Sequence, residues 1–161
     1  MSLAPPSSQR AGDFGHQPNL NKKRILVVDD DAVVIRALSI KLKANGFDVL
    51  IAKDGAAAIR TVRTERPDLI LLDITFPADV NTVSWDGFLI MEWLKRLEEA
   101  DNVPIIIISA GNSEKCKNRA RAAGAAAFFH KPISHDALFR YIRRKLNLKR
   151  AAAPRLFPAR S

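Results

Sequence analysis

Apolar and polar positions along this chain separate five strand-like segments from five helical ones. The segments 25–28, 69–72 and 105–108 contain no polar residue, which is typical of strands buried on both faces of a parallel sheet. The strands are predicted at 24–28, 47–52, 69–73, 104–109 and 125–130, and the helices at about 32–45, 55–65, 87–100, 113–123 and 135–146. This alternation predicts an α/β fold, in which a doubly wound, five-stranded parallel sheet carries helices on both faces.

Capping residues stand at the ends of the predicted helices. A side-chain oxygen directly before a helix can accept a hydrogen bond from the first backbone amides. The candidate N-caps are Asp31, Asp54, Asn112 or Ser113, and Ser134. Gly46 fits the stop of the first helix, and Gly124 ends the fourth. In the helix at 87–100, the apolar residues expected to share one side are Leu89, Ile90, Trp93, Leu94 and Leu97.

Polar residues follow four of the strands at the point where each strand ends. They are Asp29 and Asp30 after the first strand, Asp73 at the end of the third, Ser109 at the end of the fourth and Lys131 after the fifth. In open α/β sheets, ligands bind in the crevice beyond the carboxyl ends of the strands. If the strand order is 2-1-3-4-5, the first and third strands are neighbours and their carboxylates meet.

Three carboxylates and one ammonium group at this edge would leave a formal charge of −2. At about 5 Å and an effective dielectric near 20, each carboxylate pair repels by roughly 3 kcal/mol, so the cluster holds either a proton or a cation. Oxygen ligands without His or Cys indicate Mg²⁺. A metal, a lysine and a hydroxyl around one carboxylate are the parts needed for phosphoryl transfer to Asp73, which would form an aspartyl phosphate.

At these residues the sequence resembles the receiver domain of bacterial two-component response regulators. The resemblance covers residues 23–147 and five separated motifs, which are Val27-Val28-Asp29-Asp30, Leu71-Leu72-Asp73 with Pro77 four residues on, Asp86-Gly87, Ile108-Ser109-Ala110, and His130-Lys131-Pro132-Ile133. It implies a flavodoxin-like fold and a dependence on Mg²⁺. It also implies phosphorylation by a partner histidine kinase or phosphotransfer protein, and a downstream protein target.

The resemblance also implies roles around the metal. Asp30 and Asp73 would ligate Mg²⁺ directly, with the backbone carbonyl of Thr75 as a third ligand. Asp29 would act through a water molecule.

Further roles concern the phosphoryl group. Lys131 would contact it, and the peptide bond from Lys131 to Pro132 would be cis, an isomer that proline makes accessible. Ser109 matches the hydroxyl that swings inward after phosphorylation. Phe128 matches the aromatic switch residue that follows it inward.

The clearest departure from the family pattern lies in the loop after the phosphoacceptor strand. Family members commonly have two residues between the proline and the aspartate, whereas this chain has the eight residues 78–85. Longer surface loops cost little free energy, since doubling the length adds about 0.6 kcal/mol. We expect this loop to influence partner choice or the lifetime of the phosphate. Trp85 either anchors a partner or packs the loop down.

Two other classes of protein need residues that this sequence lacks. A haloacid-dehalogenase-type phosphatase needs a second Asp two residues after the nucleophile, where this chain has Thr75. A dinucleotide-binding domain needs a Gly-rich loop where this chain has acids at 29–31. A degenerate receiver that acts only as a partner-binding module stays open as the alternative. The receiver is not expected to be an enzyme beyond its own phosphorylation and dephosphorylation, and its output would be protein contact or onward relay.

Composition limits the remaining possibilities. Of the 161 residues 47% are apolar, and no apolar run is long enough to span a bilayer, so we expect no membrane insertion. A single cysteine indicates a reducing compartment, and we therefore expect a cytoplasmic protein. The net charge is +9, but residues 24–146 carry only +3 of it, and we therefore expect solvated basic ends and no nucleic-acid partner. The predicted organisation is a disordered segment at 1–22, a receiver domain at 23–147 and a basic tail at 148–161.

Overall fold

The computed structural model describes residues 21–74, 87–111 and 114–148. Several predictions from the sequence therefore lie outside the described residues. They concern Thr75, the loop 78–85 with Trp85, the fourth N-cap at Asn112 or Ser113, the disorder of residues 1–20 and the tail beyond Leu148.

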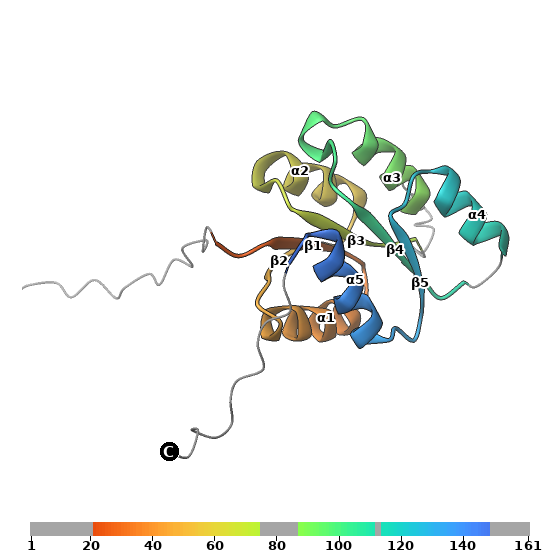
Figure 1. The fold of residues 1–161 in the computed structure, drawn as a ribbon. Coiled ribbons are helices and arrows are strands. Elements are labelled where there is room, and N and C mark those ends of the chain that lie inside the picture. Colours follow the sequence, from red (N-terminus) through yellow and green to blue (C-terminus); the bar gives the residue numbers. More distant parts are fainter. Residues whose placement is uncertain (1–20, 75–86, 112–113, 149–161) are drawn as a thin grey trace, which may run out of the picture.

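A five-stranded parallel sheet forms the centre of the molecule (Figure 1). Its strands are β1 (Arg24–Val28), β2 (Asp48–Ala52), β3 (Leu69–Asp73), β4 (Ile105–Ser109) and β5 (Ala127–His130). They follow the order β2-β1-β3-β4-β5, so the predicted order is confirmed. β1 and β3 are therefore neighbours, with Val28 opposite Leu72.

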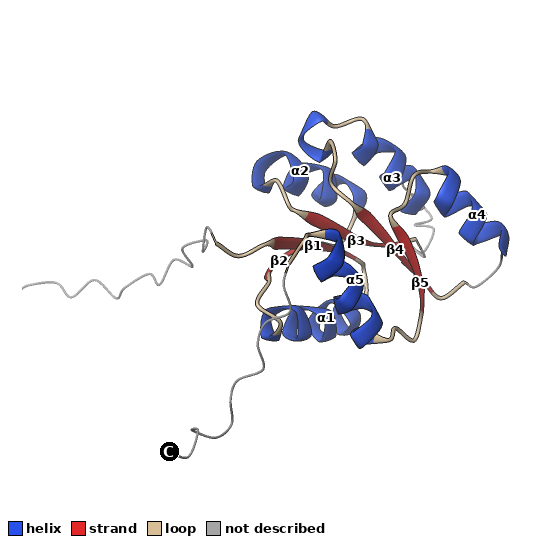
Figure 2. Cartoon of the chain, viewed as in Figure 1, coloured by secondary structure: helices blue, strands red, loops and turns tan. Residues whose placement is uncertain are grey.

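Helices cover both faces of this sheet, as the sequence predicts (Figure 2). They are α1 (Ala32–Ala44), α2 (Gly55–Glu65), α3 (Gly87–Lys95), α4 (Glu114–Ala122) and α5 (His135–Lys145). Helices α1 and α5 lie on one face and α2, α3 and α4 on the other (Figure 1). None of the described helices is long and apolar enough to cross a membrane.

Two apolar cores explain why the central strands carry no polar residues. Successive side chains of a strand point to opposite faces of the sheet. Ile106 of β4 therefore joins the core under α1 and α5, whereas Ile105 and Ile107 join the core under α2, α3 and α4. Both faces of β1, β3 and β4 are buried in this way, which requires apolar residues at every position.

The predicted helix caps that can be examined are present. Asp31 accepts hydrogen bonds from the amides of Val33 and Val34, at 2.8 and 3.4 Å. The side chains of Asp54 and Ser134 accept from the third residue beyond each of them, at 2.7 and 3.4 Å. Because these caps are local, they set the first turns of α1, α2 and α5 directly from the sequence.

The predicted helix at 87–100 is wrong in its second half. Helix α3 ends at Lys95, and a 3₁₀ turn at Glu98–Ala100 follows. The amides of Arg96 and Leu97 already bond to the third residue before them, so the helix tightens and stops.

The predicted apolar side of α3 is also corrected. Trp93 is 45% exposed, with the guanidinium of Arg96 lying 5.6 Å from its ring centroid. The residues that bury against the sheet are Phe88, Ile90, Met91 and Leu94.

The two-sided core generates a stability test. Ile106→Ala should lower the free energy of unfolding by about 2–5 kcal/mol, because Ile106 has no exposed surface and its truncation leaves a cavity. Ile40→Ala on the outer side of α1 is the matched control, since Ile40 is 60% exposed, and should stay within about 0.5 kcal/mol. Urea denaturation measures both changes. Equal losses in the two variants would contradict this assignment of the core.

Candidate functional site

Three carboxylates meet at the carboxyl edge of the sheet, where β1 and β3 end. One oxygen from each of Asp29, Asp30 and Asp73 can be chosen so that all three lie within 4.8 Å of one another. Asp29 and Asp73 are only 2% and 4% exposed, whereas Asp30 is exposed. The cluster therefore has two buried members and one that faces solvent.

Lys131 directly follows β5, the strand at the end of the sheet, and brings a positive charge into this cluster. Its Nζ lies 3.1 Å from Oδ2 of Asp73 and 3.4 Å from Oδ2 of Asp29. The backbone amide of Lys131 donates to the carbonyl of Ser109 at 2.8 Å, which extends the pairing of β4 and β5 by one residue. The peptide bond from Lys131 to Pro132 is cis, as the family resemblance implied.

The charges of these groups shift one another's pKa values. Burial raises the pKa of Asp29, and the nearby charge of Asp73 raises it further, against the lowering effects of the Asp31 amide and of Lys131. For Lys131, desolvation by burial lowers the pKa, but hydrogen bonds and charges from Asp73 and Asp29 outweigh it, and the pKa is raised. The lysine is therefore held charged, while the carboxylates still exceed it in number.

These residues fit a hard divalent cation. All three clustered side chains offer carboxylate oxygens, which are the donors that Mg²⁺ prefers. Asp30 faces solvent, and this leaves room for the water ligands that Mg²⁺ usually keeps. A divalent charge would also favour the ionised form of Asp29, which burial disfavours. Which of these acids ligates directly stays a prediction.

Ser109 and Phe128, the predicted switch residues, lie on the neighbouring strands β4 and β5. Ser109 is 2% exposed, and its hydroxyl accepts a hydrogen bond from the amide of Gly111 at 3.0 Å. Phe128 pairs with Ile107 in the register of the sheet and packs, half-buried, against the core under α2, α3 and α4. The switch roles of Ser109 and Phe128 stay predictions.

Gly87 has a structural role that the sequence reasoning missed. A Cβ atom added at Gly87 would lie 2.3 Å from Cα of Ile74 and 2.6 Å from the carbonyl oxygen of Asp73. The start of α3 therefore packs directly against the backbone that carries Asp73, and only glycine fits at position 87. The signal was available in the Asp86-Gly87 pair, because this glycine opens a helical pattern instead of ending one.

Comparisons with known proteins identify the family. The model of the response regulator receiver domain matches residues 25–143. The chain therefore belongs to the response regulator receiver family, and its sheet order and helices are those of the flavodoxin-like fold.

Individual relatives agree with this assignment. The chain is 34% identical to the response regulator PleD of Caulobacter vibrioides over 74% of its own length and 25% of PleD. It is 33% identical to the alkaline phosphatase synthesis transcriptional regulatory protein PhoP of Bacillus subtilis, over 82% of its own length and 52% of PhoP. The chain thus spans between a quarter and about half of the length of these two relatives.

A solved structure resembles the fold and carries a metal. The receiver domain of the sensor histidine kinase PA1611 from Pseudomonas aeruginosa has a TM-score of 0.68 and 26% sequence identity. The match covers 78% of this chain and 98% of that domain, which was crystallised with a magnesium ion coordinated in its active site cleft.

The close approach at Gly87 can be tested by adding one methyl group. Gly87→Ala should lower the free energy of unfolding by about 1–3 kcal/mol, because the new Cβ would overlap backbone atoms that cannot rotate away. Gly111→Ala is the control, since among the described residues the nearest atom to its new Cβ is Oγ of Ser109 at 3.4 Å. Thermal and urea unfolding measure both. A Gly87→Ala variant as stable as the wild type would rule out the contact.

Proposed function

We propose that this receiver accepts a phosphoryl group on Asp73 in a two-component phosphorelay. The donor would be a sensor histidine kinase or a phosphotransfer protein, and Mg²⁺ would be required. The observation that carries the proposal is the position of Lys131, whose Nζ bridges Asp73 and Asp29 inside an oxygen-lined cluster. A carboxylate beside a fixed cation and a set of hard-metal ligands is suited to phosphoryl transfer.

The chain's own residues would divide the chemistry as follows. A carboxylate oxygen of Asp73 attacks the phosphorus atom, and the bond from phosphorus to the donor nitrogen breaks, with its electron pair staying on the donor imidazole. Lys131 holds positive charge beside the attacking carboxylate and the incoming phosphoryl oxygens. Asp73 and, to a smaller extent, Asp29 raise the pKa of Lys131, and both carboxylates contact its Nζ. A bound Mg²⁺ would neutralise further charge on the phosphoryl oxygens.

Signalling would follow from a change at the same edge of the sheet. The new phosphoryl oxygens would attract the hydroxyl of Ser109, which would exchange its bond with Gly111 for one to the phosphate. The space vacated by Ser109 would let Phe128 turn inward. The altered surface would then contact a downstream protein or a second phosphotransfer partner in the cytoplasm. On this proposal the chain catalyses only its own phosphorylation and dephosphorylation.

A small phosphodonor tests the phosphoacceptor. Acetyl phosphate with Mg²⁺ should add one acid-labile phosphoryl group to the wild type, and Asp73→Asn should abolish the gain because the nucleophile is removed. Intact-protein mass spectrometry measures both. The exposed acid of helix α4, in the variant Glu114→Gln, is the control and should label normally. An unchanged wild-type mass, under conditions in which another receiver domain labels, would favour the degenerate receiver.

A phosphoryl mimic tests the metal requirement separately. Beryllofluoride should raise the melting temperature only when Mg²⁺ is present, since a ligand that binds the folded state alone stabilises it by mass action. Asp30→Asn should reduce the shift, because one oxygen ligand loses its charge. A shift of equal size in the presence of a chelator would count against the metal site.

A further inference from the structure

A basic groove lies between α1 and α5, and none of its residues belongs to the acidic cluster. Its main part has a volume of about 690 Å³, and a smaller part of about 170 Å³ continues from it. Both parts share Asn45, Arg143 and Leu148. Among the residues that the structure describes, the charged ones that line the two parts are Lys22, Lys23, Lys41, Arg140, Arg143 and Arg144, against the single acid Asp136.

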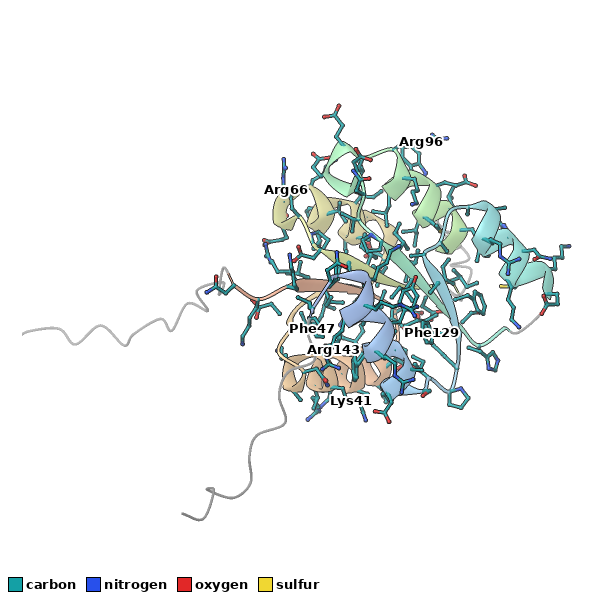
Figure 3. All side chains as sticks on the ribbon, viewed as in Figure 1. Lys41, Phe47, Arg66, Arg96, Phe129 and Arg143 are labelled. Carbon is teal, nitrogen blue, oxygen red and sulfur yellow. The ribbon has the colours of Figure 1, made fainter. Side chains whose placement is uncertain are left out.

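Two of the arginines are held in place by neighbours. Arg143 donates a hydrogen bond to the side chain of Asn45, which ties α5 to the end of α1. Figure 3 labels Arg143 on α5 and Lys41 on α1. The guanidinium of Arg144 lies 5.1 Å from the ring centroid of Tyr141. Less side-chain entropy is lost when such arginines bind carboxylates, which their planar donor groups match well.

The His135 imidazole also lines the groove and is affected by the same positive charges. Burial lowers the pKa of His135, and the charge of Lys41 lowers it further, against the raising effect of Asp136. The lowered pKa favours the neutral imidazole, so the positive potential of the groove comes from its lysines and arginines.

We propose that this groove, the α1–α5 groove, binds an acidic segment of a partner protein. Six cations against one acid make it complementary to carboxylates. The chain's own C-terminal residues 149–161 contain four basic residues and no acid, so charge disfavours them as the occupant. A second copy of the chain, at +9, is disfavoured in the same way.

A peptide fits the groove better than a nucleic acid does. Single-stranded nucleic acids bind by stacking bases on exposed aromatic rings. The phenyl rings that line this groove, Phe47 and Phe139, are only 3% and 6% exposed and form its apolar floor, and the third ring, the half-buried imidazole of His135, is small. An extended acidic segment could place carboxylates on the basic rim and apolar side chains on this floor. The groove would then recruit a partner independently of phosphorylation at Asp73.

Charge reversal tests the proposal with a matched control. A fluorescein-labelled decaglutamate peptide should bind the full chain without any phosphodonor, and binding should weaken as salt is raised. The double variant Lys41→Glu/Arg140→Glu should weaken binding at least about tenfold, as measured by fluorescence anisotropy. Arg60→Glu/Arg63→Glu on α2, an exposed pair on the other face of the sheet, changes the net charge equally and should stay within about twofold.

Three results would overturn the α1–α5 groove as a peptide site. The first is an absence of peptide binding to the wild type, and the second is equal weakening of peptide binding by both double variants. The third is tighter binding of decathymidylate than of decaglutamate, with decathymidylate binding lost only in the groove variant. Labelling by acetyl phosphate checks that each variant is folded. It also keeps this proposal separate from the phosphoacceptor, because groove variants should label normally whether or not they bind the peptide.

Discussion

The contact of one ammonium group with two buried carboxylates organises the edge of this sheet. Asp29 and Asp73 are nearly inaccessible, and their mutual repulsion at such short range costs roughly 3 kcal/mol at an effective dielectric near 20. Lys131 offsets part of this cost from β5, the strand at the end of the sheet. Asp30 adds a third negative charge that no described lysine contact balances, so the edge stays suited to a divalent cation.

Packing and chemistry are coupled through the backbone of β3. The strand is buried on both faces, so its end cannot move without disturbing two cores. Gly87 adds a second constraint, because the start of α3 lies directly against the carbonyl of Asp73. The position of Asp73 is therefore fixed by packing, while the hydroxyl of Ser109 is bonded only to a loop amide among its described partners.

The molecule presents two surfaces of opposite charge. The edge beyond β1 and β3 is acidic and suits a metal and a phosphoryl group, whereas the α1–α5 groove is basic and suits carboxylates. They are built from different residues, so each can be altered without the other. On these two proposals, one receiver would exchange phosphate at one surface and hold a partner at another.

The sequence by itself determined the alternation of strands and helices, the helix caps and the residues at the carboxyl edge, because each depends on local patterns or on the rule that parallel strands end together. The strand order was expected from the resemblance to the receiver family. It could not determine where α3 stops or that Trp93 lies outside the core, since both depend on which side of the helix meets the sheet. It also missed the contact of Gly87 with β3. The α1–α5 groove was decided only by tertiary structure, because its cations come from distant parts of the chain and meet only when the two helices pack side by side.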